Sequence, residues 1–194
     1  MTAGTRQRIL DAALACFDER GVTATSLEEI RLRAAVSTGS MYHHFPGGKD
    51  DVVADLHLGA VRRFQDAMLA ELHERRTPRT VVRAVARQQV LWVAEHRDLG
   101  TLLVGRAPGT RHRTDPEMAT LNERFFGTLR GWLEARMADG SIRAMPLPVA
   151  VALWLGPAVM LARQILGGEL PEDVETLATA TADAVWAALR TGSS

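Results

Sequence analysis

The stretch SLEEIRLRAAVSTGSMYHHFPGGK, residues 26–49, predicts two short helices separated by a tight turn. Ser26 is a residue type that favours the N-cap of a helix. Glu28 and Glu29 follow it in the first turn, where carboxylates interact favourably with the positive end of the helix dipole. Ser37 is a second start signal of the same kind. Two helices joined by so few residues must meet at a sharp angle, which is the geometry of a helix-turn-helix unit.

The outward side chains of the second helix are hydrogen-bond donors, and none of them is acidic. Small hydroxyl groups allow a helix to lie deep in the major groove of DNA, while Tyr and His side chains near its end reach phosphates. From Arg31 to Lys49 the chain has three fixed positive charges and no Asp or Glu, although the net charge of the whole chain is zero. The local charge therefore indicates a polyanion as the partner, and the helix-turn-helix with its donor face indicates double-stranded DNA. The residues predicted to contact DNA are Ser26, Ser37, Thr38, Ser40, Tyr42, His43, His44 and Lys49.

Two of these residues have specific expected roles. Ser40 is the first candidate for reading a base edge in the groove. Lys49 is the candidate for a phosphate contact, because Gly47 and Gly48 free the backbone just before it. A third helix begins there, and its unpaired N–H groups and dipole end favour an anion. We expect this segment to hold the DNA strand that flanks the groove.

The run TxxSLEEI followed by AAVSTGSMYHHFPGGK resembles the N-terminal domain of the TetR-type (tetracycline repressor-like) bacterial transcription regulators. That resemblance implies a ligand-responsive DNA-binding regulator, most simply a repressor, with a helical C-terminal domain that encloses a small-molecule pocket. The residues that match the family pattern are Val36, Ser37, Tyr42, His44, Phe45 and Lys49.

Two residues depart from the family pattern. Ala35 stands in the turn where the family usually has Gly, so a left-handed conformation there would cost about 1 kcal/mol relative to Gly. Arg31 replaces the Ala that usually follows Ile30, which leaves the tilt of the first helix open.

The composition indicates a globular protein without internal disulfides, since the chain has 194 residues, 46% of them hydrophobic, and a single cysteine. Residues 1–10 are polar and lack the apolar core of a signal peptide, so we expect a cytoplasmic protein. Residues 147–166 approach the length of a membrane span. Prolines flank the start of this segment, Gly156-Pro157 interrupts it and it contains Arg163, so we expect a buried helix and no membrane partner.

Helical periodicity through the rest of the chain predicts an all-α fold. A first helix over 5–20, with Gly21 as its stop signal, would complete a three-helix DNA-binding domain, residues 1–48. A helix over 49–73 would connect it to a larger helical regulatory and dimerisation domain, residues 49–194. The further helices expected there cover residues 80–96, 99–104, 116–139, 148–167 and from about 171 onward.

An enzyme is disfavoured because the sequence offers no convincing catalytic constellation. His43 and His44 are adjacent, so on a helix they diverge by about 100° and cannot bind one metal ion together. The GGK run that ends at Lys49 lacks the earlier glycine and the following Ser or Thr of a nucleotide-binding loop. Cys16 has no plausible base beside it. We therefore expect no catalysis, no metal site and no cofactor.

The aromatic and methionine residues of the C-terminal region have two interpretations. Such residues at helical spacing are usually core, whereas the resemblance implies that some of them line a pocket. Gln89 and Arg163 lie close in register to these apolar faces, where a polar group needs a partner from protein or ligand. The candidate residues for binding an unknown small-molecule effector are Gln89, Trp92, Met118, Phe125, Trp154, Met160 and Arg163.

A single recognition helix reads only a few base pairs, so we expect a homodimer that binds a palindromic operator. Small residues in the last two helices would allow their close approach in a four-helix interface. The residues predicted for this interface are Ala150, Ala158, Ala162, Ala178, Ala182 and Ala188. The alternative interpretation is a helical small-molecule-binding or scaffold dimer without sequence-specific DNA binding.

Overall fold

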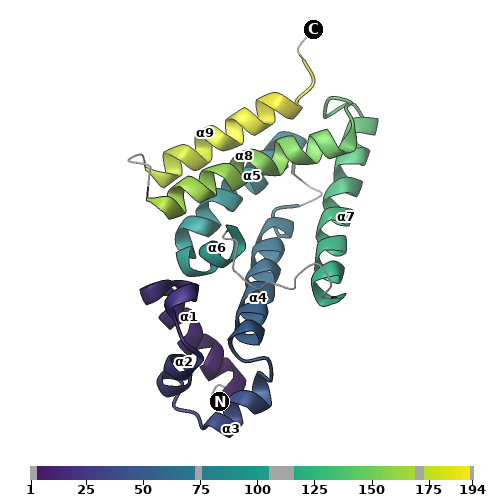
Figure 1. Cartoon of the computed structure of the whole chain (residues 1–194). Helices are drawn as coiled ribbons and strands as arrows, with labels where there is room; N and C mark the ends of the chain where they lie inside the picture. The colour runs from purple at the N-terminus through teal and green to yellow at the C-terminus, as the bar shows by residue number, and fades with distance from the viewer. Residues whose placement is uncertain (1–3, 73–75, 105–115, 169–172, 193–194) are drawn as a thin grey trace.

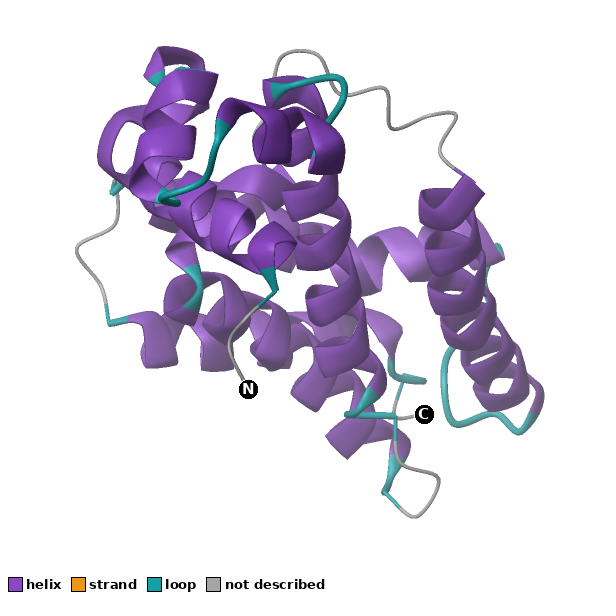
Figure 2. Ribbon diagram, turned by 90° about the horizontal axis from the view of Figure 1, so that it is seen from below, coloured by secondary structure: helices purple, strands orange, loops and turns teal. Residues whose placement is uncertain are grey.

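The computed structural model describes residues 4–72, 76–104, 116–168 and 173–192. Within these ranges the chain consists of helices joined by loops (Figure 2), with one isolated bridge between Ile142 and Arg190. The all-α prediction is therefore confirmed. The helices are α1 (Thr5–Ala24), α2 (Leu27–Arg33), α3 (Thr38–His44), α4 (Lys49–Leu69), α5 (Pro78–Glu95), α6 (Arg97–Val104), α7 (Pro116–Ala138), α8 (Leu147–Gly167) and α9 (Val174–Leu189).

Helices α1, α2 and α3 form an N-terminal domain at one end of the molecule, and α4 leads from it to the C-terminal helices (Figure 1). Helices α5, α8 and α9 pack against one another, while α6 contacts α1, α4, α5 and α8. One hydrophobic core runs from Ile9 in α1 through Val52 in α4 to Leu189 in α9. The two ends of the molecule are therefore joined by packed structure, with α4 and α6 at the junction.

The regular part of α1 ends at Gly21, as the sequence predicts. Gly21 leaves helical geometry with a φ of 79°, which glycine adopts without strain, and a short further turn beyond this kink extends α1 to Ala24. The buried hydroxyl of Thr25 caps this end of α1. It lies within hydrogen-bond distance of the carbonyl oxygens of Cys16, at 3.1 Å, and Gly21, at 2.9 Å.

The boundary between α4 and α5 differs from the predicted one. Helix α4 ends at Leu69, and the predicted end at His73 lies outside the described residues. Helix α5 begins at Pro78, earlier than predicted, because proline fits the first helical turn and the side chain of Thr77 caps that turn.

The C-terminal helices are anchored by Trp154 of α8. Its side chain is fully buried, and its indole N–H donates a hydrogen bond to the carbonyl oxygen of Val82 in α5 at 3.1 Å. Helix α9 begins at Val174 with Asp173 as its N-cap. The start predicted near Pro171 lies outside the described residues.

Helix α8 is long and apolar enough to cross a membrane by length and composition, although Pro157 interrupts it. Only 28% of its apolar window is buried. The buried side chains lie on one face and pack against the other helices. On the opposite face Val149 is 47% exposed and Met160 is 57% exposed. The expectation of a buried helix is therefore right for one face of α8 only.

Candidate DNA interface and effector cavity

The turn between α2 and α3 contains the left-handed residue that the sequence indicated. Ala35 has a φ of 52°, and no other non-glycine residue in the described ranges has a positive φ. Beside it, the guanidinium of Arg31 forms an ion pair with Glu28 at 2.6 Å and donates a hydrogen bond to the carbonyl oxygen of Val36 at 2.9 Å. Arg31 and Ala35, the two residues that depart from the family pattern, therefore lie close together at this turn. Arg31 holds the backbone in place next to Ala35, whose left-handed conformation is strained.

Helix α2 is oriented by a complete capping box. The hydroxyl of Ser26 accepts a hydrogen bond from the backbone N–H of Glu29 at 3.2 Å, and the Glu29 carboxylate accepts one from the backbone N–H of Ser26 at 2.7 Å. The hydrogen bonds that the backbone N–H and the hydroxyl of Ser26 donate to the Glu29 carboxylate lower the pKa of Glu29. Because the Ser26 hydroxyl is used in this way, its role in the structure is to start α2 in the correct direction.

Helix α3 is anchored by one face and leaves the other open. Met41 is buried, and Phe45, which caps the helix end, is buried as well. The hydroxyl of Ser37 accepts a hydrogen bond from the backbone N–H of Ser40 at 3.1 Å, as expected for an N-cap. Tyr42 is 51% exposed although it is aromatic.

Six of the eight residues predicted to contact DNA belong to α3 or its N-cap, whereas Ser26 begins α2 and Lys49 begins α4. Ser37, Thr38, Tyr42 and His43 are exposed. Ser40 and His44 are half-buried. The face offers hydroxyl and imidazole groups and no carboxylate, so it suits a phosphate backbone and the edges of bases.

Lys49 has a structural role that the sequence analysis missed. Its ammonium group donates hydrogen bonds to the carbonyl oxygens of Val22 at 3.1 Å and Thr25 at 2.8 Å. These bonds tie the first residue of α4 to the end of α1. Two of the three ammonium hydrogens are therefore used inside the protein.

The expected phosphate clamp at Gly47 and Gly48 needs correction. The backbone N–H of Gly47 donates to the Asp51 carboxylate, and a side chain at Gly47 would collide with that carboxylate. Gly48 has a φ of 68°, which requires glycine. The glycines therefore close the loop onto Asp51, whose negative charge disfavours a phosphate at this helix start.

Arg6 supports the end of the recognition helix. Its guanidinium lies 5.7 Å from the centre of the Phe45 ring and forms an ion pair with Asp55 of α4 at 2.7 Å. Cation–π and ionic contacts of this kind link α1, α3 and α4. The sequence does not predict this role of Arg6, because no local signal marks partners so far away in the chain.

An apolar cavity of about 160 Å³ lies between α4, α5, α6 and α8. Gln89 is the one polar residue of its lining, and its amide nitrogen makes only a long contact of 3.4 Å with the carbonyl oxygen of Val85. Trp92 packs edge-on against the lining residue Phe64, with ring centres 5.4 Å apart. The residues that line the cavity are Phe64, Gln89, Val93, Leu103, Ala158, Val159 and Ala162.

Of the seven residues predicted to bind an effector, the structure places Gln89 in the cavity wall and Trp92 directly behind it. Trp154 and Phe125 belong to the main core, and Met118 belongs to a small cluster with Leu58 and Leu121. Met160 and Arg163 lie on the exposed face of α8. Apart from Phe64, the remaining lining residues are small or aliphatic, and sequence patterns do not distinguish these from core.

Two capped helices at a fixed angle, one of them with an open donor face, define a helix-turn-helix DNA-binding protein with a helical C-terminal domain. The chain belongs to the TetR family of bacterial regulatory proteins. The family model described as "Bacterial regulatory proteins, tetR family" matches residues 9–56. The HTH-type transcriptional repressor KstR2 of Rhodococcus jostii is 31% identical over 147 residues, which are 73% of this chain and 70% of that protein.

Other similarities are local or structural. The regulator AcrR of Shigella flexneri is 50% identical over 46 residues, which are 24% of this chain and 21% of that protein. The regulator FadR of Bacillus subtilis, solved in complex with stearoyl-CoA, covers 94% of this chain and 98% of its own, with a TM-score of 0.77 and 18% identity. A protein with unknown function from Rhodococcus sp. RHA1 covers 97% of each chain with a TM-score of 0.79 and 21% identity. These structures share the fold, and the family consists of transcription regulators rather than enzymes.

Proposed function

We propose that this protein is a cytoplasmic, ligand-responsive repressor that binds a palindromic operator as a homodimer. The observation that carries the proposal is the open face of α3, on which hydroxyl and imidazole groups gather without any carboxylate while Met41 holds the helix from behind. Residues 1–48 would bind DNA, and residues 49–194 would dimerise and bind the effector. The relative KstR2 is named a repressor, which favours repression over activation.

The roles on α3 follow from position and exposure. Thr38 and Ser40 lie in the first turn, where a recognition helix meets base edges. Tyr42, His43 and His44 lie at the end of the helix and would contact phosphates. Ser26 and Ser37 would act by orienting the two helices, since their hydroxyls are already bonded to the backbone.

The experiment is a titration of labelled duplexes from the DNA that flanks the protein's own gene, followed by fluorescence anisotropy. We expect one duplex to bind at least about 10³-fold more tightly than a scrambled duplex of equal length. Ser40→Ala should change the preference among operator variants, whereas Thr128→Ala, an exposed hydroxyl removal on α7, should not. Equal binding to all duplexes would favour the alternative of a scaffold dimer without sequence-specific DNA binding.

The homodimer is supported by the outer faces of α8 and α9. Exposed apolar or small residues follow one face of each helix, and a continuous apolar face suits an interface. The residues on these outer faces are Val149, Ala152, Gly156 and Met160 in α8 and Ala180, Ala184 and Ala187 in α9. The choice of helices stays as predicted, but the predicted residues are wrong. Ala150, Ala158, Ala162, Ala178 and Ala182 are buried inside the protomer, and Ala188 is half-buried.

The effector would occupy the cavity beside Gln89. The lining is almost entirely apolar, so we expect an apolar molecule with one group that exchanges a hydrogen bond with the Gln89 amide. The structural neighbour FadR was solved with stearoyl-CoA, whose stearoyl chain is apolar.

The route from effector to DNA would run through α4 and α6. Phe64 of α4 and Leu103 of α6 both line the cavity, and α6 also contacts α1 of the DNA-binding domain. A ligand that favours one position of these helices would change the spacing of the two recognition helices in the dimer, which must match major grooves about 34–36 Å apart. Operator DNA should then weaken effector binding by the same factor by which the effector weakens operator binding.

A further inference from the structure

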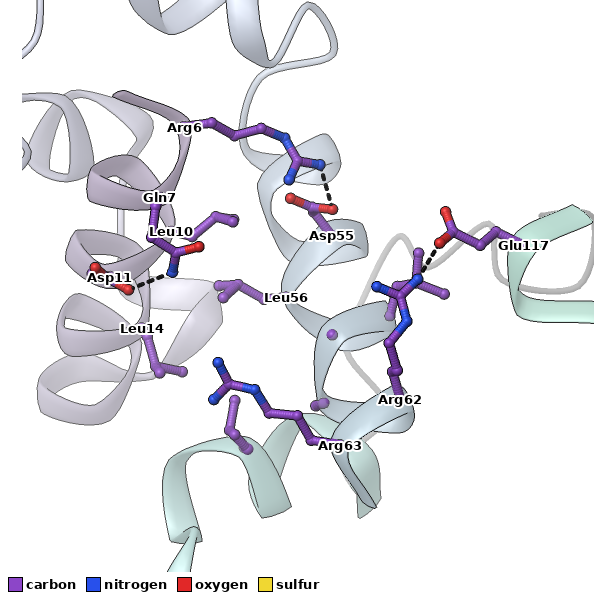
Figure 3. Close-up of a pocket in the computed structure, with 14 residues that line it drawn as sticks. Arg6, Gln7, Leu10, Asp11, Leu14, Asp55, Leu56, Arg62, Arg63 and Glu117 are labelled. Atoms are coloured by element: carbon purple, nitrogen blue, oxygen red, sulfur yellow. Dashed lines mark hydrogen bonds and ion pairs between the residues drawn. The ribbon is translucent and has the colours of Figure 1, made fainter. Parts of the chain in front are cut away.

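A second cavity, of about 370 Å³, lies where the DNA-binding domain meets the rest of the molecule (Figure 3). Its walls come from α1 and α4, with contributions from α6 and α7. Leu10, Leu56 and Leu99 give it an apolar floor and are almost fully buried. It shares no lining residue with the apolar cavity beside Gln89, so it is a separate site.

Three arginines line this second cavity, and two of them have acidic partners. Arg6 is paired with Asp55, and Arg62 is paired with Glu117. Arg63 has no ion-pair partner among the residues that the structure describes. In Figure 3 its guanidinium extends from α4 towards α1, over the space between the two helices. Arg63 is therefore the cation that remains available to a ligand.

The opposite wall contains one carboxylate without a cation. Asp11 of α1 accepts a hydrogen bond from the amide of Gln7 at 2.8 Å and has no cationic partner within the described ranges. Its charge repels an anion from the α1 side. An anionic group would consequently be held beside the Arg63 guanidinium and away from Asp11.

We propose that this cavity binds a small organic anion, a carboxylate or a phosphate monoester with a short apolar chain. The planar guanidinium of Arg63 matches the geometry of either anionic group and would hold it through paired hydrogen bonds. The apolar chain would lie on the leucine floor, which lowers the local dielectric constant and strengthens the ionic contact. An inorganic ion would lack the apolar contact, and an uncharged molecule would lack the ionic contact.

The position of the site gives it a route to the recognition helix. Arg6 lines the cavity, and the same guanidinium packs over Phe45 at the end of α3. Occupation of the cavity would change the surroundings of Arg6 and so alter the support of α3. The cavity would thus be a second ligand-binding site that influences α3, distinct from the effector cavity of the proposed function.

The test is a titration of the DNA-free protein, labelled with ¹³C at its leucine methyl groups, with hexanoate and with hexyl phosphate. We expect saturable shifts at Leu10, Leu14 and Leu56, and the tighter probe identifies the anionic group. Arg63→Gln should weaken binding of both probes by about tenfold, as expected for loss of a charged hydrogen bond. Asp11→Asn should strengthen it.

Two controls decide the outcome. Arg79→Gln makes the same change in charge on α5, outside this cavity, and should leave both affinities unchanged. Hexanol has the same chain without the charge and should bind far more weakly. Equal binding of hexanol and hexanoate, or an unchanged affinity in Arg63→Gln, would overturn the proposal. Because no DNA is present, either result is independent of operator binding.

Discussion

The ammonium group of Lys49 donates a hydrogen bond to the carbonyl oxygen of Thr25 over 2.8 Å, and so the first residue of α4 holds the end of α1. With the second bond, to Val22, it satisfies backbone groups that the end of α1 leaves open. Lys49, which the sequence predicts to contact a phosphate of DNA, therefore also stabilises the fold of the N-terminal domain.

Lys49→Met keeps the aliphatic stem and removes both hydrogen bonds. We expect a loss of about 1–3 kcal/mol in the free energy of unfolding, because two carbonyl groups lose charged donors. Urea denaturation measures this loss, and an unchanged midpoint would contradict the structural role. The salt dependence of DNA binding tests the predicted phosphate contact of Lys49. Loss of one phosphate contact makes the negative slope of log affinity against log salt less steep by about 0.9.

Ala35→Gly should stabilise the protein. Ala35 has a φ of 52°, which costs an alanine about 1–2 kcal/mol, while glycine adopts it freely. The greater freedom of glycine in the unfolded chain offsets part of this, so we expect a net gain of about 0.5–1 kcal/mol. A thermal melt of the variant beside the parent protein measures it. A lower melting temperature would show that Arg31 already relieves the strain in the turn.

A matched pair of charge insertions separates the dimer interface from the protomer core. Ala184 is exposed on the outer face of α9, so Ala184→Glu should give a folded monomer with normal helical content. Ala182 is 1% exposed and faces the core, so Ala182→Glu should unfold the protein instead. Light scattering and circular dichroism together distinguish these results. A stable dimer of Ala184→Glu would place the interface elsewhere.

The stability of the junction should depend on pH through His57 of α4. Burial lowers the pKa of His57 below 6.5, and its ring nitrogen Nδ1 lies 2.9 Å from the carbonyl oxygen of Leu102 in α6. The unfolded state binds more protons, so the stability associated with the neutral ring is fully present above pH 6.5 and is lost as the pH falls through the lowered value.

The measurement compares melting temperatures of the parent and His57→Gln at pH 8 and pH 5.5. The parent protein should lose more stability on acidification than the variant. Equal losses in both proteins would show that His57 does not carry this dependence.

Local signals in the sequence were enough to predict the helix-turn-helix. The hydroxyls of Ser26 and Ser37 each accept a hydrogen bond from a backbone N–H three residues further along the chain. The left-handed turn at Ala35 also follows from neighbouring positions. The roles of Lys49 and Arg6 could not be predicted, because their partners lie 24 and 49 residues away in the chain.

The interface residues were mispredicted for a different reason. Helix α8 is apolar on both faces, and periodicity cannot say which face is turned inward in such a helix. In the structure, the hydrogen bond from Trp154 to Val82 fixes which face of α8 is directed inward. Ala150 and Ala158 therefore lie inside the protomer. The apolar cavity beside Gln89 could be predicted only in part, because most of its wall consists of small and aliphatic side chains, which resemble core residues in a sequence.

The central claim is that two copies of α3 read two successive major grooves. Hydroxyl-radical footprinting of the tightest-binding duplex tests it most directly. We expect two protected segments on one face of the duplex, with centres one helical turn apart, about 34–36 Å, and with related sequences in opposite orientation. Thr38→Ala combined with Ser40→Ala should abolish the pattern while Ala184→Glu should reduce it to weak single-site protection. Uniform protection along the duplex, or a pattern that the α3 double variant leaves intact, would contradict the account.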